Sequence, residues 1–179
     1  MKAKAPLSLK GRAIALLAQR EHSAPELRRK LLRWARDERV NPLGAGEPAP
    51  ADPDADDVAA QASTRVDDLI AWLREHHYLS EERFVDSRVH ARAARYGNLR
   101  IRQELAQHGL AMPAETAQAL KDSELQRATE VWRRKFGAPA ETPAERARQA
   151  RFLAARGFSG EAIARVMRHA SDAGSSDPD

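Results

Sequence analysis

Residues 80–110 read SEERFVDSRVHARAARYGNLRIRQELAQHGL, and this stretch predicts two helices joined by a three-residue hinge. Within the hinge, Gly97 can adopt the left-handed conformation that ends a helix, and Asn98 is a favourable N-cap for the next one. After the hinge, Ile101 and Leu105 lie four residues apart and therefore share one helical face. Nothing in the stretch indicates catalysis, so fold, charge and partners carry the functional analysis.

The composition predicts an all-α protein. Of the 179 residues, 42% are hydrophobic but only 5% are aromatic, a balance that favours many small helices over a sheet-based core. The chain contains no cysteine, which excludes disulfides and thiolate metal sites. No apolar run approaches the ~20 residues of a membrane span, and the N-terminus lacks the apolar segment of a signal peptide. We therefore expect a soluble, cytoplasmic protein without membrane association.

The basic character of the chain is larger than its net charge of +4 indicates. Eight of the 26 acidic residues lie in the segments 41–62 and 170–179, which contain no lysine or arginine, so the remainder holds 30 bases against 18 acids. This excess indicates a polyanionic partner, or a site close to one.

The helical pattern recurs three times along the chain. Each occurrence has a helix, a tight turn with an N-cap, a second helix and a third, and the caps are Ser23, Asn98 and Thr142. The first and last caps are each followed three residues later by glutamate, the capping-box pattern. The second helices of the later units end alike, at Gly109 and Gly157, each followed by an apolar residue. We therefore predict three tandem three-helix repeats of about 45 residues that form an elongated array.

Less regular segments separate or flank these repeats. Residues 41–62 are rich in Pro, Ala and Asp and lack helical periodicity until near their end, which predicts a flexible acidic insertion. The predicted parts are a flexible basic arm at 1–7, a first repeat at 8–79 with the insertion at about 41–62, a second repeat at 80–121, a third repeat at 122–169, and a disordered acidic tail at 170–179.

The sequence contains no motif of an enzyme or of a cofactor or metal site. A glycine-rich phosphate loop, a dinucleotide fingerprint and a nucleophile elbow are all missing, and the six histidines lack zinc-ligand spacing. We interpret His76 and His77 as the C-terminal cap of a helix. Trp34, Trp72 and Trp132 lie on or beside apolar faces, so we interpret them as core residues rather than base-stacking platforms. We expect no catalysis, no cofactor and no bound metal.

Several arginines are predicted to stand away from the core. At about 100° per residue, Arg29, Arg33 and Arg36 fall in one narrow band, opposite the apolar stripe of a helix that runs to about residue 36. A band of this kind is often only solvated surface, but it could also meet a polyanion. Further arginines away from core positions are Arg127 and Arg134 in one later helix and Arg148 and Arg151 in the next.

Five motifs follow one another in an order that resembles the RecX family of bacterial regulatory proteins. They are LLAQREHSAPELRRKL (16–31), WLREHHYLSEERF (72–84), RYGNLRIRQELAQHGL (95–110), RRKFG (133–137) and RFLAARGFSGEAI (151–163). The resemblance extends over about residues 8–169. Two features depart from the family pattern: an acidic insertion longer than a typical family loop, and the acidic tail. The fold expected from the family is three tandem three-helix repeats, which the caps and the periodicity also predict.

The resemblance implies a protein that binds RecA and the RecA filament on single-stranded DNA. It would inhibit or modulate the ATPase, strand-exchange and co-protease activities of RecA in recombination and the SOS response. We expect a monomer that lies along the filament groove and gains affinity by contacting several protomers. We hypothesise that the band of Arg29, Arg33 and Arg36 contributes to this contact, together with the hinge arginines Arg95, Arg100 and Arg102. Arg100 and Arg102 flank the apolar stripe on opposite sides, so we do not expect them to form one patch.

Two other functions stay open. A helical DNA-binding protein that acts independently of RecA is possible, because short helix-turn-helix units with basic helices can enter a major groove. However, no single helix concentrates the Asn, Gln and Arg of a base reader. An interaction scaffold without an electrostatic mechanism is the second alternative. Direct DNA binding should weaken steeply with ionic strength, whereas RecA-dependent binding should persist without DNA.

Overall fold

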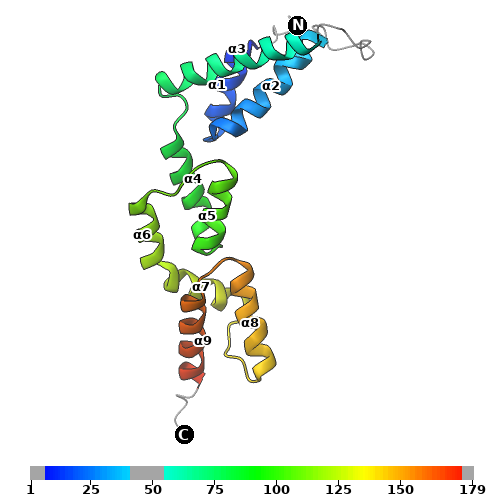
Figure 1. The fold of residues 1–179 in the computed structure, drawn as a ribbon. Helices are drawn as coiled ribbons and strands as arrows, with labels where there is room; N and C mark the ends of the chain where they lie inside the picture. The colour runs from blue at the N-terminus through cyan, green and yellow to red at the C-terminus, as the bar shows by residue number, and fades with distance from the viewer. Residues whose placement is uncertain (1–6, 41–54, 175–179) are drawn as a thin grey trace, which may run out of the picture. The chain divides into compact units, whose positions relative to one another are not determined.

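The computed structural model describes residues 7–40 and 55–174, and within these ranges all regular structure is helical (Figure 1). The helices are α1 (Leu9–Gln19), α2 (Ala24–Val40), α3 (Ala55–Glu75), α4 (Glu81–Ala93), α5 (Asn98–Gln107), α6 (Ala114–Asp122), α7 (Glu124–Lys135), α8 (Pro143–Ala155) and α9 (Gly160–Gly174). The prediction of an all-α fold with tandem three-helix repeats is confirmed. None of the helices in these two ranges combines the length and the hydropathy that a bilayer-spanning segment needs.

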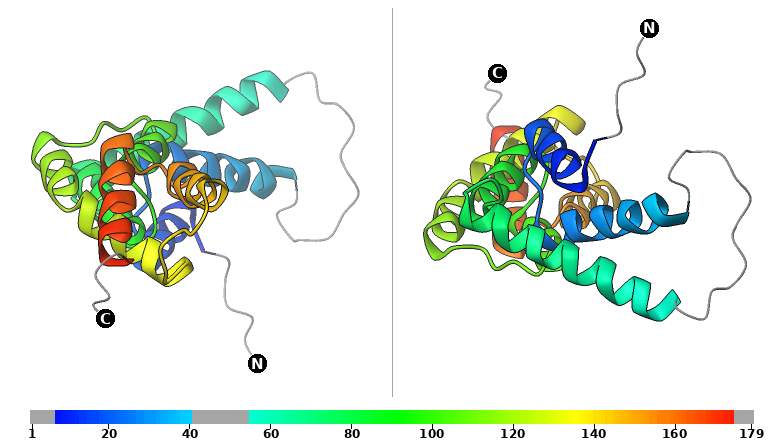
Figure 2. Two further views of the ribbon diagram at one scale, coloured as in Figure 1. Left: turned by 90° about the horizontal axis from the view of Figure 1, so that it is seen from below. Right: turned by 90° about the horizontal axis from the view of Figure 1, so that it is seen from above.

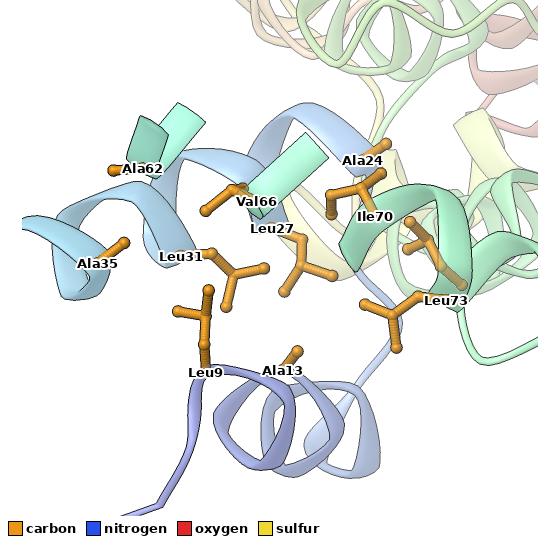
Figure 3. Close-up of a cluster of buried hydrophobic side chains, with 11 residues drawn as sticks. Leu9, Ala13, Ala24, Leu27, Leu31, Ala35, Ala62, Val66, Ile70 and Leu73 are labelled. Carbon is orange, nitrogen blue, oxygen red and sulfur yellow. The ribbon is translucent and has the colours of Figure 1, made fainter. Parts of the chain in front are cut away.

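The chain divides into two compact units, Met1–Phe84 and Val85–Asp179, and each has its own hydrophobic core. In the first unit, α1, α2 and α3 surround the core, and α2 and α3 lie side by side along their length (Figure 2). Leu27 and Leu31 of α2 point between α1 and α3 (Figure 3) and are fully buried, as the apolar stripe predicts. Their burial sets the opposite face of α2, which carries the arginine band, toward solvent.

The start of α3 corrects the predicted insertion at 41–62. Helix α3 begins at Ala55, so residues 55–62 are helical, and Ala62 is only 1% exposed in the core of the first unit. Four alanines in this segment favour the helix, and Asp56 and Asp57 in the first turn complement its dipole. The rest of the insertion, 41–54, lies outside the described residues, as does most of the predicted arm at 1–7. Helix α2 is also longer than predicted and ends at Val40.

The second unit is held by α7, α8 and α9 around a core that contains Trp132, Leu153, Phe158 and Val166. Trp132 is 6% exposed, and its indole N–H donates to the Oε1 atom of Gln149 at 2.8 Å. The prediction of a disordered tail from residue 170 is wrong for residues 170–174, because α9 continues to Gly174 and buries Ala170. Residues 175–179 lie outside the described residues.

Most predicted helix caps are confirmed. Thr142 forms the complete capping box with Glu145, and Pro143 occupies the first turn of α8. The Ser23 hydroxyl accepts the backbone N–H of Glu26 at 3.3 Å. The predicted glycine stops are also present, since Gly109 and Gly157 both have positive φ angles, of 72° and 80°.

The hinge at Gly97 is different from the prediction. Gly97 has an extended backbone with φ −80° and ψ 170°, and it occupies the N-cap position of α5, so Asn98 is the first helical residue instead of the cap. Glycine is required here for a close approach and not for a left-handed conformation. A Cβ atom on Gly97 would lie 2.2 Å from the carbonyl oxygen of Gly157 and 2.2 Å from the backbone nitrogen of Phe158. The turn before α5 therefore packs directly on the turn before α9.

Candidate interaction surfaces

The predicted arginine band on α2 exists as one surface in the first unit. Arg29, Arg33 and Arg36 are exposed and, with Leu32, line a shallow hollow of about 460 Å³. No salt bridge joins any of the three to a carboxylate within the described residues. We call this set the α2 arginine band. Its guanidinium groups are available to a partner that carries carboxylates or phosphates.

A neighbouring arginine on α2 has a different, structural role. Arg28 Nε donates to Asp67 Oδ1 of α3 at 2.6 Å, and Arg28 Nη2 donates to the hydroxyl of Ser63 at 2.7 Å. The hydrogen bond from Arg28 lowers the pKa of Asp67. This pair lies across the α2–α3 contact, so Arg28 helps to hold the helix whose outer face carries the band.

The first turn of α2 is stabilised by a network around Glu26. Arg20 forms a salt bridge with Glu26, and Lys30 Nζ lies 3.4 Å from Glu26 Oε1. Burial opposes ionisation of Glu26, but hydrogen bonding to Arg20 and the nearby cations lower its pKa to about 2. His22 is 1% exposed, and desolvation lowers its pKa. Its Nδ1 faces the carbonyl oxygen of Arg20 at 2.9 Å, and its Nε2 faces Lys30 Nζ at 3.1 Å.

Arg127 is the clearest correction among the predicted contact residues. The sequence placed it away from the core, but in the structure it is half-buried, and burial lowers the pKa of its guanidinium. Its donors reach the carbonyl oxygens of Ala93 (3.1 Å), Tyr96 (2.9 Å) and Leu120 (2.8 Å), the side-chain oxygen of Asn98 (2.6 Å) and the hydroxyl of Ser123 (3.2 Å). Arg127 therefore links α4, α5 and α6 to the start of α7, and its hydrogen-bond donors are used within the second unit.

Glu124 completes this buried polar centre, and sequence reasoning missed it. It is 6% exposed, and its Oε1 atom accepts the backbone N–H groups of Asn98 at 3.2 Å and Ser159 at 3.3 Å. One carboxylate therefore satisfies donors at the N-termini of both α5 and α9. In the sequence, Glu124 looked like an ordinary acid in a first helical turn, because the two N-termini meet only in the folded chain.

The three hinge arginines separate in the structure. Arg95 lines one hollow of the second unit, while Arg102 lines another hollow of about 430 Å³ together with Leu99, Lys121 and Arg165. The Arg100 guanidinium lies 6.0 Å from the centre of the Tyr96 ring. Arg100 and Arg102 therefore do not form one patch, as their opposite positions around the helix predict.

A pocket rich in cations lies between the end of α4, helix α7 and the end of α8. Its volume is about 370 Å³, and its charged lining residues are all basic. We define the basic pocket by Arg95, Tyr96, Arg134, Lys135, Phe152 and Arg156, with Ala94 and Val131 at its wall. Arg134 Nη2 donates to the carbonyl oxygen of Ala94 at 2.7 Å, and the Arg156 guanidinium lies 3.7 Å from the centre of the Phe152 ring. The pocket thus joins two predicted arginines with residues that the sequence did not indicate.

The predicted arginines of α8 are exposed. Arg148 precedes Phe152 by four residues, so it lies on the helical face that carries Phe152 and Arg156. Arg151 lies on an adjacent face. The sequence did not indicate Arg156 and Lys135 because both lie at helix ends, just before the positive-φ glycines Gly157 and Gly137. Only the packing of α8 against α7 brings them together.

The three tryptophans and His76 make contacts within the protein. Trp132 is a core residue as predicted, while Trp34 and Trp72 are half-buried beside the core of the first unit. The Trp72 ring stacks on His76 at 4.1 Å, and His76 Nδ1 faces the Trp72 carbonyl oxygen at 2.9 Å, near the end of α3. Among the described residues, no group of three or more His, Asp or Glu side chains is arranged to hold a metal ion.

Comparison with known proteins identifies the family of the chain. Residues 80–113 match the family model "RecX, second three-helix domain", and residues 122–167 match "RecX, third three-helix domain". The protein of Ralstonia nicotianae named "Regulatory protein RecX" is 42% identical over 167 residues, which are 92% of this chain and 89% of the relative. The chain belongs to the RecX family. A RecX protein of Leptothrix cholodnii is 43% identical over 90% of this chain and 88% of the relative, and one of Herminiimonas arsenicoxydans is 41% identical over 93% and 95%.

The two matched segments contain the whole lining of the basic pocket. Arg95 and Tyr96 lie in the segment that matches the second RecX domain, and Arg134, Lys135, Phe152 and Arg156 lie in the segment that matches the third. The hydrogen bonds of Arg127 and Glu124 likewise join these two segments of the RecX chain. The pocket and the polar centre therefore depend on the packing of one RecX domain on the next.

Proposed function

We propose that this chain binds RecA and the RecA filament on single-stranded DNA and restrains RecA activity. The observation that supports the proposal is the RecX identity, which extends over about nine-tenths of the chain in relatives named as regulatory proteins. In this proposal the chain acts as a monomer in the cytoplasm, where RecA works, and it acts by binding and not as an enzyme. Inhibition of ATP hydrolysis, strand exchange and co-protease activity would follow from occupation of the filament.

The α2 arginine band is our proposed contact surface in the first unit. Its three guanidinium groups are exposed, and each can form paired hydrogen bonds with a carboxylate or a phosphate. In the second unit, we propose contacts from those arginines predicted from the sequence that are exposed in the structure, which are Arg95, Arg100, Arg102, Arg134, Arg148 and Arg151. Arg127 is left out of this surface because its donors are occupied within the second unit. Weak contacts from several repeats to several protomers would add up through multivalency.

The test is RecA ATP hydrolysis on single-stranded DNA at fixed salt, with increasing amounts of this protein. We expect suppression below one molecule per RecA protomer. The triple variant Arg29→Ala, Arg33→Ala, Arg36→Ala should inhibit about tenfold less well, if each arginine contributes about 0.5 kcal/mol at an exposed site. Circular dichroism would confirm that this variant keeps its helicity.

The matched control is the triple lysine variant at the same three positions. It keeps the charge but loses the bidentate geometry, so intermediate inhibition would indicate carboxylate or phosphate recognition by arginine. Unchanged hydrolysis at a molar excess of the wild-type protein would contradict the RecA proposal. If the protein then bound DNA by itself, the alternative of RecA-independent DNA binding would replace it.

A further inference from the structure

The basic pocket has a lining that suits an anionic polymer. Arg95, Arg134, Lys135 and Arg156 contribute four cations around a hollow of about 370 Å³, and no acidic residue lines it. Like charges converging on one hollow repel one another, so an arrangement of this kind is stabilised when an anion enters it. The hollow lined by Arg102 provides a contrast, because there Asp122, Glu124 and Glu161 accompany the cations.

Two of the four cations are held in position from within the unit. Arg134 is anchored by its hydrogen bond to the carbonyl oxygen of Ala94, and Arg156 lies over the face of Phe152. Arg95 and Lys135 are exposed, and within the described ranges no salt bridge occupies either of them. The pocket therefore combines two pre-positioned guanidinium groups with two cations that can move to meet a ligand. Pre-positioning reduces the entropy lost when an anion binds.

The pocket also contains an aromatic ring that lies among cations. Tyr96 is half-buried at the pocket wall, and the guanidinium groups of Arg92 and Arg100 lie 5.8 Å and 6.0 Å from its ring centre. Phe152 has one face covered by Arg156 and meets Phe136 edge-on at 5.1 Å, so Tyr96 is the ring better placed for a ligand. A tyrosine beside arginines offers both stacking and phosphate contacts to a nucleotide.

We propose that the basic pocket binds single-stranded nucleic acid directly, with Arg95, Arg134, Lys135 and Arg156 on successive phosphates and Tyr96 stacked on an unpaired base. Arg148 extends the cationic surface along the same face of α8. An acidic peptide would satisfy the cations but would leave the aromatic ring without a role, and a duplex keeps its bases stacked on one another. The proposal does not depend on RecA and is tested without it.

The experiment measures binding of the full chain to fluorescein-labelled oligo(dT) by anisotropy over a range of salt concentrations. The double variant Arg95→Gln, Lys135→Gln should bind about tenfold more weakly at low salt. Its salt slope should also fall by about 1.4, since each contact with a single-strand phosphate contributes about 0.7. The matched control Arg165→Gln, Arg168→Gln removes the same charge from exposed positions of α9, and it should change affinity by no more than about twofold.

A separate variant isolates the stacking contact. Tyr96→Leu keeps apolar volume at the pocket wall, and it should weaken oligo(dT) binding about tenfold while the salt slope stays unchanged. Circular dichroism of each variant would establish that the helices are intact. A purely structural role of Tyr96 would instead alter unfolding and leave binding by the folded protein unaffected.

Four results would overturn the proposal. Equal weakening by the pocket variant and the α9 control would show diffuse attraction with no local site. A duplex of the same length that binds as tightly as oligo(dT) would exclude stacking on an unpaired base. Displacement of oligo(dT) by poly-glutamate at equal charge concentration would identify an acidic peptide as the ligand class. Absence of oligo(dT) binding at low salt would also refute the site, whatever the outcome of the RecA assay.

Discussion

Replacing Gly97 by alanine should strongly destabilise the second unit. The new Cβ would lie 2.2 Å from the Gly157 carbonyl oxygen and 2.2 Å from the Phe158 nitrogen, so the two turns would have to separate. Separation breaks the hydrogen bonds from Gly97 N–H to Arg156 O at 2.9 Å and from Leu99 N–H to Gly157 O at 3.0 Å. Overpacking costs about 1–3 kcal/mol and each of the two hydrogen bonds about 1 kcal/mol, which sums to about 3–5 kcal/mol.

This loss is a large part of the free energy of unfolding, which is about 5–15 kcal/mol for a typical domain. The assay is urea unfolding followed by circular dichroism at 222 nm and by tryptophan fluorescence, because Trp132 lies in the core of the second unit. Two other glycine variants serve as controls. Gly109→Ala introduces no clash but places alanine at φ 72°, which should cost about 1–2 kcal/mol.

Gly160→Ala is the second control, since a Cβ there meets no atom within 4 Å and the residue begins α9. It should change the free energy of unfolding by less than about 1 kcal/mol, with stabilisation as the expected sign. The reasoning predicts the order Gly97, Gly109, Gly160 from the largest loss to the smallest. If Gly97→Ala destabilised the protein no more than Gly109→Ala, the close contact of the two turns could not be what requires glycine at this position.

Two further predictions concern buried charges. Arg127→Met should lower the free energy of unfolding of the second unit by about 2–4 kcal/mol, because three carbonyl oxygens lose their donor. The measurement is urea unfolding, and the control is Arg148→Met at an exposed position. Equal losses of unfolding free energy in the two variants would contradict the structural role of Arg127. The first unit should lose stability as the pH falls, because the pKa values of His22 and Glu26 are both lower in the folded chain than their ordinary values of 6.5 and 4.5. The stabilisation is complete above about pH 6.5 and is lost as the pH falls, and the contribution of Glu26 is lost between about pH 4.5 and pH 2. The variant Glu26→Gln should flatten this acid part of a plot of the urea midpoint against pH. A plot with the wild-type shape would refute the assignment to Glu26.

Local sequence patterns were sufficient to predict most of the helices and their ends. Capping boxes and glycine stops depend on interactions within a few residues, so Thr142, Gly109 and Gly157 could be interpreted without knowledge of the fold. The apolar stripe of α2 was equally local, and it also predicted the outward direction of the α2 arginine band. These features follow from helical periodicity and from the hydrogen-bonding needs of helix termini.

Predictions failed where a residue's role depends on a distant part of the chain. Gly97 matched the pattern of a left-handed stop, but its need for glycine comes from Gly157, sixty residues later in the chain. Arg127 matched the pattern of a solvated arginine, but its partners come from α4, α5 and α6. Periodicity describes a helix against an unspecified core and contains no information about which turn of another helix lies opposite.

The sequence by itself determined the all-α class, the tandem three-helix pattern, the family and the outward-facing arginines of α2. Each of these depends on residue spacing or on local capping, which the chain carries in its order. Only the tertiary structure decided that Glu124 and Arg127 form a buried polar centre, and that Arg95, Arg134, Lys135 and Arg156 share one pocket. The physical reason is that desolvation and charge convergence arise from contacts between helices, and these contacts exist only after the helices have packed.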